Sequence, residues 1–599
     1  SADRINYIFD LSQFNADIQA DGVTGPYRLD GNFMKNEELF GIAVNIGDLS
    51  QGDDVDLDCG LTHPKSESHL RYEGVYNPAQ GTFSGSLSGD ANKTADFINI
   101  LLGKNIVDTE YNQPLMFSLD ASLATNIMKL TNATVKFSQY IDGSGNVVIP
   151  ITNIDKLENA GKPVIDIDYK AVSLDLRPLI NLLKEKIVLY KGTDEKFELK
   201  NKYDLTYSIY ADKAIINDEP LGYVENMSAK GALRDNSFSI DEFSAEAQGN
   251  FKFNAMGNLI EDNSKPNYYA KVQIEGKSLS TLASVWGYKL DAPSQSAYRD
   301  LKLDFNIAGT SAETEIGALN LIMDKTNITG KGKVIYENID KYDIQIKADK
   351  LNLDSYVADD NQDDSFVETV KSDLNKISAL KNKDITLNLD VDNLMLRKVP
   401  YNNLSAKLQI VDNALKINDL KIANLMNSNV VMNGYIKNTD GDNVSIDSLK
   451  FQISTSETIS PLLNKFNVEL PEWKIIRAQP LDIDGELSGN FQKADIKLQM
   501  IANKDTNFNY NGKISQGENF EFDGKVELKT TNLGLLVNSL GGSWKNLSSN
   551  SVINCEGNIS GSSLNWQFSE AKCFLGNASY EGYVKYNEKS NLHWYFLSA

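Results

Sequence analysis

The chain has little of the side chains on which most catalytic sites depend. Its 599 residues include only three histidines and three cysteines. No Ser-His-Asp or Cys-His set, Walker-type loop or dinucleotide fingerprint can be assembled from the sequence. Carboxylates are too frequent to single out a catalytic pair. We therefore expect no catalytic residue, no cofactor and no enzyme activity, and an enzyme hidden in the acidic loops is only a residual alternative.

Metal-binding residue types cluster at one place, where Cys59, His63 and His69 are spaced by four and six residues. This spacing matches no usual zinc pattern. The surroundings look polar and loop-like, so we expect a solvated hairpin and no metal. Residues 142–146 (Asp-Gly-Ser-Gly-Asn) resemble a calcium loop but lack the downstream glutamate, and we interpret them as a hairpin turn.

The other two cysteines, Cys555 and Cys573, lie 18 residues apart in strand-like contexts. They could face each other across neighbouring strands as a disulfide, or they could be two buried thiols. The sequence leaves both alternatives open, because it does not fix the Cα separation that a bridge requires.

Basic residues are in deficit. The 59 Lys and Arg stand against 82 Asp and Glu, which gives a formal net charge of −23. Phosphate binding depends on clustered Lys and Arg, so a nucleic-acid partner is excluded. The densest charge is acidic, at residues 53–58 and 359–364, and both runs are interpreted as solvated loops.

Long apolar runs are also missing. No segment approaches the roughly 20 apolar residues needed to cross a bilayer, and no signal peptide is recognisable. Both ends look cut from something larger, so we expect a membrane anchor to lie outside this sequence.

What the chain does have is alternation of apolar and polar residues with a period of two, nearly throughout. Side chains alternate across a strand, so each such run predicts one apolar and one wet face, as in antiparallel sheet. Gly-containing pairs between or within the runs predict turns, or bulges and close approaches inside strands. Clear examples of the alternation are 203–211, 301–307, 342–348, 385–391 and 494–500, and of the glycine pairs 142–146, 433–434, 440–441, 511–512 and 523–524.

Six short apolar clusters interrupt the strand pattern. Their lead-in residues are separated by 79, 105, 73, 104 and 77 residues, and this long–short alternation suggests duplicated units. The clusters are 97–102, 179–183, 279–286, 351–357, 459–466 and 533–540. An amphipathic helix is predicted at 366–380, packed on the sheet or covering one end, and a second helix near Pro178.

The phrase at 344–357 (IQIKADKLNLDSYV) resembles a recurring phrase of the bacterial AsmA family, in which an alternating strand runs into a leucine-x-leucine-aspartate step. Related phrases occur at 272–279 and 526–536, and the strand pairs at 481–491 and 494–502 are similar to the family's glycine-punctuated pairs. The likeness extends from about residue 165 to 585.

The resemblance implies a periplasmic protein of Gram-negative bacteria, tethered to the inner membrane by an N-terminal helix that this chain lacks. AsmA-like and TamB-like proteins are similar in build to bridge-like lipid-transfer proteins. It implies phospholipids as partners, carried between inner and outer membrane in support of outer-membrane biogenesis. An outer-membrane protein is a further candidate partner, although no docking terminus is recognisable.

We therefore expect a mainly β fold, an elongated, repetitive antiparallel sheet curled into an apolar groove, with a few short interspersed α-helices. Four regions are predicted: 1–164, 165–358, the acidic loop and helix at 359–384, and 385–599. The predicted groove lining is Leu303, Phe305, Ile344, Ile346, Leu387, Leu389, Leu408, Ile410, Ile496 and Leu498.

The rival interpretation is a secreted or surface β-repeat scaffold or adhesin, in which the same side chains form closed sandwich cores. Alternation alone indicates burial and does not say what covers the buried face.

Overall fold

The computed structural model shows a mainly β protein, with 72% of the described residues in strands and 8% in helices, so the described helices can cover only a small part of the sheet. The sheet is open and dominated by antiparallel pairs. No helix among the described residues is long and apolar enough to span a membrane. The structure describes residues 12–51, 54–102, 112–124, 127–138, 141–150, 162, 164–178, 180–181, 203–218, 222–357, 366–380, 382–438, 444–459, 462, 479–516, 520–539, 551–562, 564–587 and 591–598.

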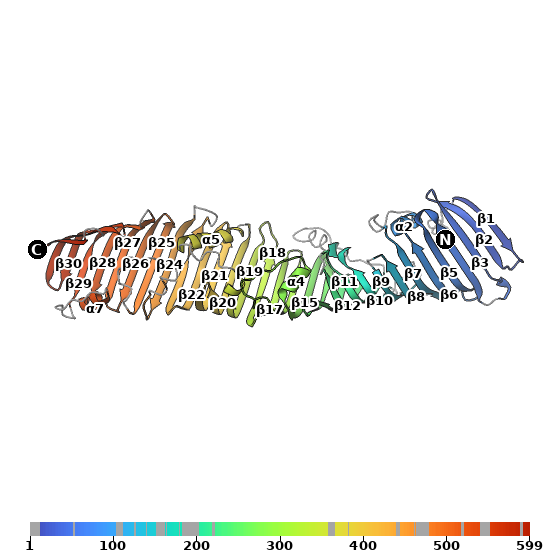
Figure 1. The fold of residues 1–599 in the computed structure, drawn as a ribbon, viewed down its shortest axis with the longest axis horizontal. Helices are drawn as coiled ribbons and strands as arrows, with labels where there is room; N and C mark the ends of the chain where they lie inside the picture. Colours follow the sequence, from blue (N-terminus) through green and yellow to red (C-terminus); the bar gives the residue numbers. More distant parts are fainter. Residues whose placement is uncertain are drawn as a thin grey trace. The chain divides into compact units, whose positions relative to one another are not determined.

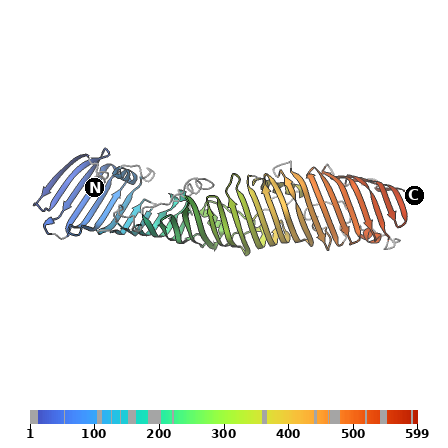
Figure 2. The same cartoon turned by 180° about the vertical axis from the view of Figure 1, so that it is seen from behind.

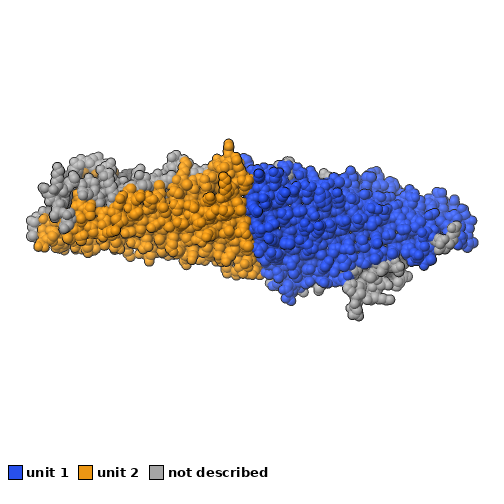
Figure 3. Space-filling model, turned by 90° about the horizontal axis from the view of Figure 1, so that it is seen from below, with its two compact units in different colours: residues 1–290, 301–311 blue, residues 291–300, 312–599 orange. Residues whose placement is uncertain are grey.

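The chain divides into two compact units, coloured separately in Figure 3. Unit 1 holds residues 1–290 and 301–311, and unit 2 holds 291–300 and 312–599. Each is described by itself.

In unit 1 the strands follow one another in chain order, as the blue-to-green ribbon of Figure 1 shows. Its helices are α2 (Thr94–Leu102) and α4 (Leu279–Val285), with 3-10 turns η1 (Leu49–Gln51) and η2 (Pro64–Ser66). Its strands are β1 (Ser12–Ala20), β2 (Tyr27–Lys35), β3 (Glu38–Ile46), β4 (Val55–His63), β5 (Ser68–Asn77), β6 (Thr82–Ala91), β7 (Leu115–Ala124), β8 (Ile127–Phe137), β9 (Ile141–Pro150), β10 (Val164–Asp175), β11 (Asp204–Ile215), β12 (Tyr223–Arg234), β13 (Ser237–Ala247), β14 (Phe251–Asp262), β15 (Lys265–Lys277) and β16 (Asp300–Thr310).

Unit 2 continues in the same manner, and Figure 2 shows its ladder from behind. Its helical segments are η5 (Leu353–Ser355), α5 (Phe366–Ser378) and α7 (Leu533–Ser539). Its strands are β17 (Glu313–Met323), β18 (Thr326–Ile335), β19 (Lys341–Asn352), β20 (Asp384–Leu396), β21 (Val399–Val411), β22 (Ala414–Leu425), β23 (Ser428–Lys437), β24 (Ser445–Thr455), β25 (Leu481–Asn490), β26 (Lys493–Ala502), β27 (Thr506–Gln516), β28 (Phe520–Thr530), β29 (Ile553–Ser562), β30 (Asn565–Leu575), β31 (Ala578–Asn587) and β32 (Asn591–Ser598).

Two of the described strand pairs are parallel, whereas the alternation pattern predicted an antiparallel sheet. β10 pairs with β11, and β19 pairs with β20, both in parallel register. Two parallel strands cannot be joined by a hairpin, because the chain must first return to the side of the sheet where the first strand began. The alternation pattern missed these pairs because a one-sided strand has the same pattern whichever way its neighbour runs.

The long–short alternation of the sequence corresponds to blocks of four and five strands. The successive blocks are β7–β10, β11–β15, β16–β19, β20–β24 and β25–β28. After four antiparallel strands, the chain is back at the side of the sheet where the first of them began. A crossover carries the chain to the opposite ends of the strands, so a fifth strand is needed to bring it back. Both five-strand blocks start at the second strand of a parallel pair, β11 or β20.

The helix predicted at 366–380 is confirmed as α5, and it packs on the sheet through Leu374, which is 4% exposed. Helices α2, α4 and α7 form within the clusters at 97–102, 279–286 and 533–540. The cluster at 351–357 contains only the 3-10 turn η5. Near Pro178, residues 177, 178, 180 and 181 are helical. The rest of that segment, most of 459–466 and the acidic run 359–364 lie outside the described residues.

The glycines at residues 142–146, 433–434, 511–512 and 523–524 lie inside strands, so the predicted alternative of close approaches within strands is confirmed for them and the turn is wrong. Residues 440–441 lie outside the described residues. The acidic run at 53–58 is likewise not a loop throughout, because β4 begins at Val55. Actual hairpin turns use two non-glycine residues with positive φ, such as Asp412-Asn413 (47° and 58°) and Asn503-Lys504 (53° and 64°). Asn and Asp tolerate this left-handed conformation better than other side chains.

Glycines mark where neighbouring strands approach too closely for a side chain. A Cβ on Gly512 would lie 2.4 Å from the Asp523 carbonyl oxygen, and one on Gly231 would lie 2.0 Å from that of Ser239. Both glycines share a strand face with apolar residues. Gly60, which faces the polar side of β4, meets nothing nearer than 4.0 Å. The ladder therefore bends toward its apolar face at these glycines.

This bend predicts unequal effects of alanine at the two kinds of glycine. Gly512→Ala forces a methyl group into the backbone of β28, so we expect a loss of about 1–3 kcal/mol in stability, the usual cost of overpacking. Gly60→Ala has room and should change stability little. Urea unfolding of each variant measures the difference. Equal effects would contradict a sheet curled toward its apolar side.

Candidate functional site

The apolar face of unit 2 is formed by side chains that line up across the strands. Two rows, built from directly paired residues and separated by one further row on the same face, contain only apolar, glycine, cysteine or tyrosine side chains from β17 or β18 to β31. We call this surface the apolar face of unit 2. The first row is Ile316, Gly332, Ile344, Leu387, Leu408, Ile417, Gly434, Leu449, Leu487, Ile496, Gly512, Gly524, Ile559, Phe568 and Val584. The second is Ile328, Ala348, Val391, Leu404, Ile422, Val430, Ile453, Ile483, Met500, Phe508, Leu528, Cys555, Cys573 and Tyr580.

Unit 1 has a comparable apolar face. One of its rows runs from β1 to β12 without a polar residue. Its members are Ala16, Gly31, Ile42, Leu61, Leu70, Gly89, Phe117, Val135, Gly143, Ala171, Ala211 and Met227.

The residues predicted to line a groove all lie in strands whose apolar side chains share one face. In unit 2, Ile344, Leu387 and Leu408 are direct neighbours, and Ile346 pairs with Leu389. Ile410 lies opposite Ile385, while Ile496 and Leu498 lie farther along the same face on β26. Leu303 and Phe305 belong to β16 in unit 1. The ten residues are therefore divided between the units.

All ten predicted lining residues are half-buried rather than sealed. Full burial occurs at separate positions, as for Val391 (1% exposed) in the middle of β20 and Leu481 (2%) at the start of β25. Within each unit the described strands form one sheet, and no second layer of described strands packs on its apolar face. The ten predicted lining residues thus lie neither in a dry sandwich core nor on a fully solvated surface.

The opposite face is polar and ion-paired. The ammonium of Lys333 lies 2.8 Å from the Glu313 carboxylate, and that of Lys230 lies 3.2 Å from Glu242, with all four side chains exposed. Such pairs contribute little stability, so their main effect is to keep this face in water.

Aromatic rings fill the places left by glycines on the apolar face. A Cβ on Gly485 would lie 2.1 Å from the ring of Phe451, and one on Gly557 would lie 2.7 Å from that of Phe568. The Tyr207 hydroxyl passes over Gly231 and donates to the Ser239 carbonyl at 2.9 Å. These rings lie over the backbone of the glycines and fill the space that side chains would otherwise occupy.

Tyrosine hydroxyls on the two apolar faces are shielded from water. Burial is the main cause that raises the pKa of Tyr72, Tyr169, Tyr207 and Tyr510 above the usual phenol value. On its strand, each of the four tyrosines shares one face with the apolar or glycine residues two positions away. The direction of these shifts agrees with a surface of low polarity on the curled side of the sheet.

Short segments cover the apolar faces locally. In unit 1, α2 contributes Phe97 to a buried cluster with Phe33, Phe40 and Ala91. In unit 2, α5 contributes Leu374 to a buried cluster with residues near the start of β22 and the end of β23. A second cluster joins Ile459 and Leu462 to apolar residues from β19 to β26, among them Val391, Leu404 and Leu481.

His63 lies beneath α2, which corrects the expectation of a polar, solvated hairpin at 59–69. Its side chain is 1% exposed and its ring stacks on Phe40 with centroids 4.6 Å apart. Burial lowers the pKa of His63 and favours the neutral ring. Cys59 shares this apolar face, whereas His69 faces the polar side and pairs with Asp90 at 3.0 Å, so the three do not converge. Among the described residues, no group of three or more His, Cys, Asp or Glu is arranged to hold a metal ion.

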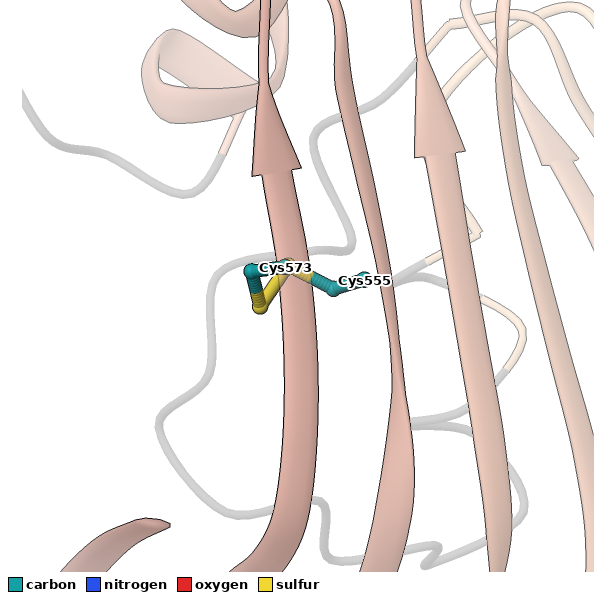
Figure 4. Close-up of a disulfide and its surroundings, with 2 residues drawn as sticks. All are labelled: Cys555 and Cys573. Carbon is teal, nitrogen blue, oxygen red and sulfur yellow. A yellow bond between two sulfur atoms is a disulfide. The ribbon is translucent and has the colours of Figure 1, made fainter. Parts of the chain in front are cut away.

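Cys555 and Cys573 are direct cross-strand partners on β29 and β30 and are joined by a disulfide, with Cα atoms 4.1 Å apart (Figure 4). This separation is close to that of a non-hydrogen-bonded antiparallel pair. The bond lies within the second apolar row of unit 2. Sequence spacing suggested the pairing, but not its position on the apolar face.

Comparison of the chain with protein-family models, with curated proteins and with solved structures finds no match in any of the three. The resemblance to the AsmA family therefore stays a prediction.

Proposed function

We propose that this chain is an AsmA-like conduit that carries phospholipids along its apolar faces. The observation that supports this most directly is the continuity of the two apolar rows of unit 2, in which most side chains of the first row stay half-buried without a second layer of described strands. A long apolar strip that the described residues cover only locally is suited to aliphatic chains.

The energetics favour binding without specific contacts. Each methylene removed from water contributes about 0.8 kcal/mol, so an acyl chain that lays about ten methylenes on the face gains about 8 kcal/mol before losses of motion. Lipid head groups would project into water from the open side. Selectivity among head groups should therefore be weak, and movement along the strip should not require breaking a strong site.

We further propose a periplasmic location, with transport between inner and outer membrane in support of outer-membrane biogenesis. The disulfide between Cys555 and Cys573 supports an oxidising compartment, because structural disulfides are rare in the cytosol. A tether to the inner membrane would come from a helix outside this sequence.

Co-purification tests the proposal. We expect the chain, extracted gently from cells and analysed by native mass spectrometry, to carry several phospholipids of mixed head group. Delipidated chain should also take up a fluorescent phospholipid from donor vesicles and release it to acceptor vesicles. A chain that is lipid-free and takes up no lipid would refute a conduit and leave the scaffold interpretation.

A further inference from the structure

α5 lies over the apolar face of unit 2 because of the parallel pair beneath it. β19 and β20 run in the same direction, so the chain must return from the end of β19 at Asn352 to the start of β20 at Asp384. α5 is part of that return. Its contacts show that it crosses the apolar side of the sheet and not the polar side.

α5 contacts residues at both ends of the strands beneath it. At one end, Arg397 in the turn between β20 and β21 donates from Nη2 to both carboxylate oxygens of Asp373, each at 3.1 Å. Toward the other end, Leu374 belongs to a buried cluster with Leu415 at the start of β22 and Ile436 near the end of β23. The consecutive residues Asp373 and Leu374 thus link α5 to both ends of these strands.

Beneath α5 the side chains of Leu415, Ile417 and Ile436 are fully buried, in contrast to the first apolar row farther along. Ile417 is 8% exposed under the helix, whereas Ile496, in the same cross-strand row, is half-buried. Val370, Leu374 and Ile377 supply the apolar groups that complete this burial. These aliphatic side chains make the same kind of contact that an acyl chain would make.

The attachment of α5 at the β20–β21 turn is weak enough to be exchanged. The Arg397 and Asp373 side chains are 32% and 46% exposed, and ion pairs so open to water contribute little. The turn itself is held independently, because the backbone N–H groups of Arg397 and Lys398 donate to the Asp354 carboxylate at 2.5 and 2.8 Å. Loss of the ion pair would thus weaken the attachment of α5 without removing these bonds from the turn.

We propose that the surface beneath α5, lined by Leu408, Ile410, Leu415, Ile417 and Ile436, is a binding site for one phospholipid acyl chain. α5 occupies this site as an internal competitor, and an arriving lipid displaces it. This inference rests on the proposed function and adds to it a place where passage along the apolar face of unit 2 is controlled.

The test uses the full chain and vesicles containing phosphatidylethanolamine with a diazirine on one acyl chain. After photolysis, labelled peptides are quantified by mass spectrometry at β21–β22 (Leu408 and Ile417) and at β26 (Ile496 and Leu498). In the wild-type chain we expect strong labelling of β26 and weak labelling of β21–β22. Arg397→Gln should raise β21–β22 labelling about fivefold, as expected for loss of a modest ion pair, and leave β26 within about twofold.

Asp373→Asn removes the same ion pair from the helix side and should reproduce the result. Lys407→Gln makes the same charge change on the polar side of β21 and should have no effect. If neither Arg397→Gln nor Asp373→Asn raises β21–β22 labelling, or if β26 rises equally, α5 is not a competitor and the conduit proposal survives. Absence of labelling at every position in every variant overturns both proposals.

Discussion

Ile496→Asp is expected to reduce the phospholipid retained by the chain about tenfold or more, while the sheet stays folded. Ile496 lies in the first apolar row, between Leu487 and Gly512, and is half-buried. An ionised carboxylate there loses water whenever an acyl chain lies over it, and that loss is expensive. In the lipid-free chain the same carboxylate reaches solvent from the open side. Lipid content is measured by mass spectrometry of the purified variant, and folding by circular dichroism.

Asn511→Asp is the matched control for this variant. Asn511 is on the adjacent strand β27 but faces the polar side, where it pairs with Lys497 and Lys525. The added charge lies between two lysines, so we expect neither lipid content nor stability to fall. If Ile496→Asp unfolds unit 2 instead of emptying it, the position belongs to a closed core. Unchanged lipid content in Ile496→Asp would also contradict binding at the apolar face.

Replacing both Cys555 and Cys573 by alanine is expected to speed hydrogen exchange in β29–β31 about 100-fold. A bridge closing a loop of 18 residues removes unfolded-state entropy equivalent to about 3 kcal/mol. Strands in a ladder interact mainly with their neighbours, so the loss should stay local and leave β20–β22 unchanged. Hydrogen exchange followed by mass spectrometry resolves the two regions.

Cys59→Ala tests whether any cysteine substitution has this effect. Cys59 is a free thiol in unit 1, and its replacement should leave exchange in β29–β31 at the wild-type rate. Treatment of the wild-type chain with a reductant should reproduce the double variant. Slow exchange in β29–β31 without the bridge would mean that strand pairing alone holds this part of unit 2.

The faces of the strands could be predicted from sequence because burial on one side imposes a period of two. Ile344, Ile346, Leu387 and Leu389 were correctly placed on one surface for this reason. The amphipathic stripe of α5 was equally readable, since Val370, Leu374 and Ile377 recur at helical spacing. What α5 covers was not, because Leu415 and Ile436 are its neighbours only through the crossover.

Features that depend on strand-to-strand geometry escaped the sequence. The sequence left open whether Gly512 and Gly524 form turns or close approaches inside strands, and only their direct pairing in the ladder shows that no Cβ fits there. His63 looked solvated because its local neighbours are polar, whereas Phe40 and Phe97, which bury it, are distant in sequence. The direction of pairing between β19 and β20 was invisible for the same reason: it depends on the route of the intervening chain.

The alternation of four- and five-strand blocks has a consequence for how a molecule of this kind can change length. Inserting or deleting a single hairpin preserves the direction of every later strand, so apolar rows can be extended in steps of two strands at little structural cost. An odd change reverses all downstream strands and demands a new crossover. Relatives of this chain should therefore differ in reach by whole hairpins, and any odd difference should coincide with the gain or loss of a segment that crosses the sheet.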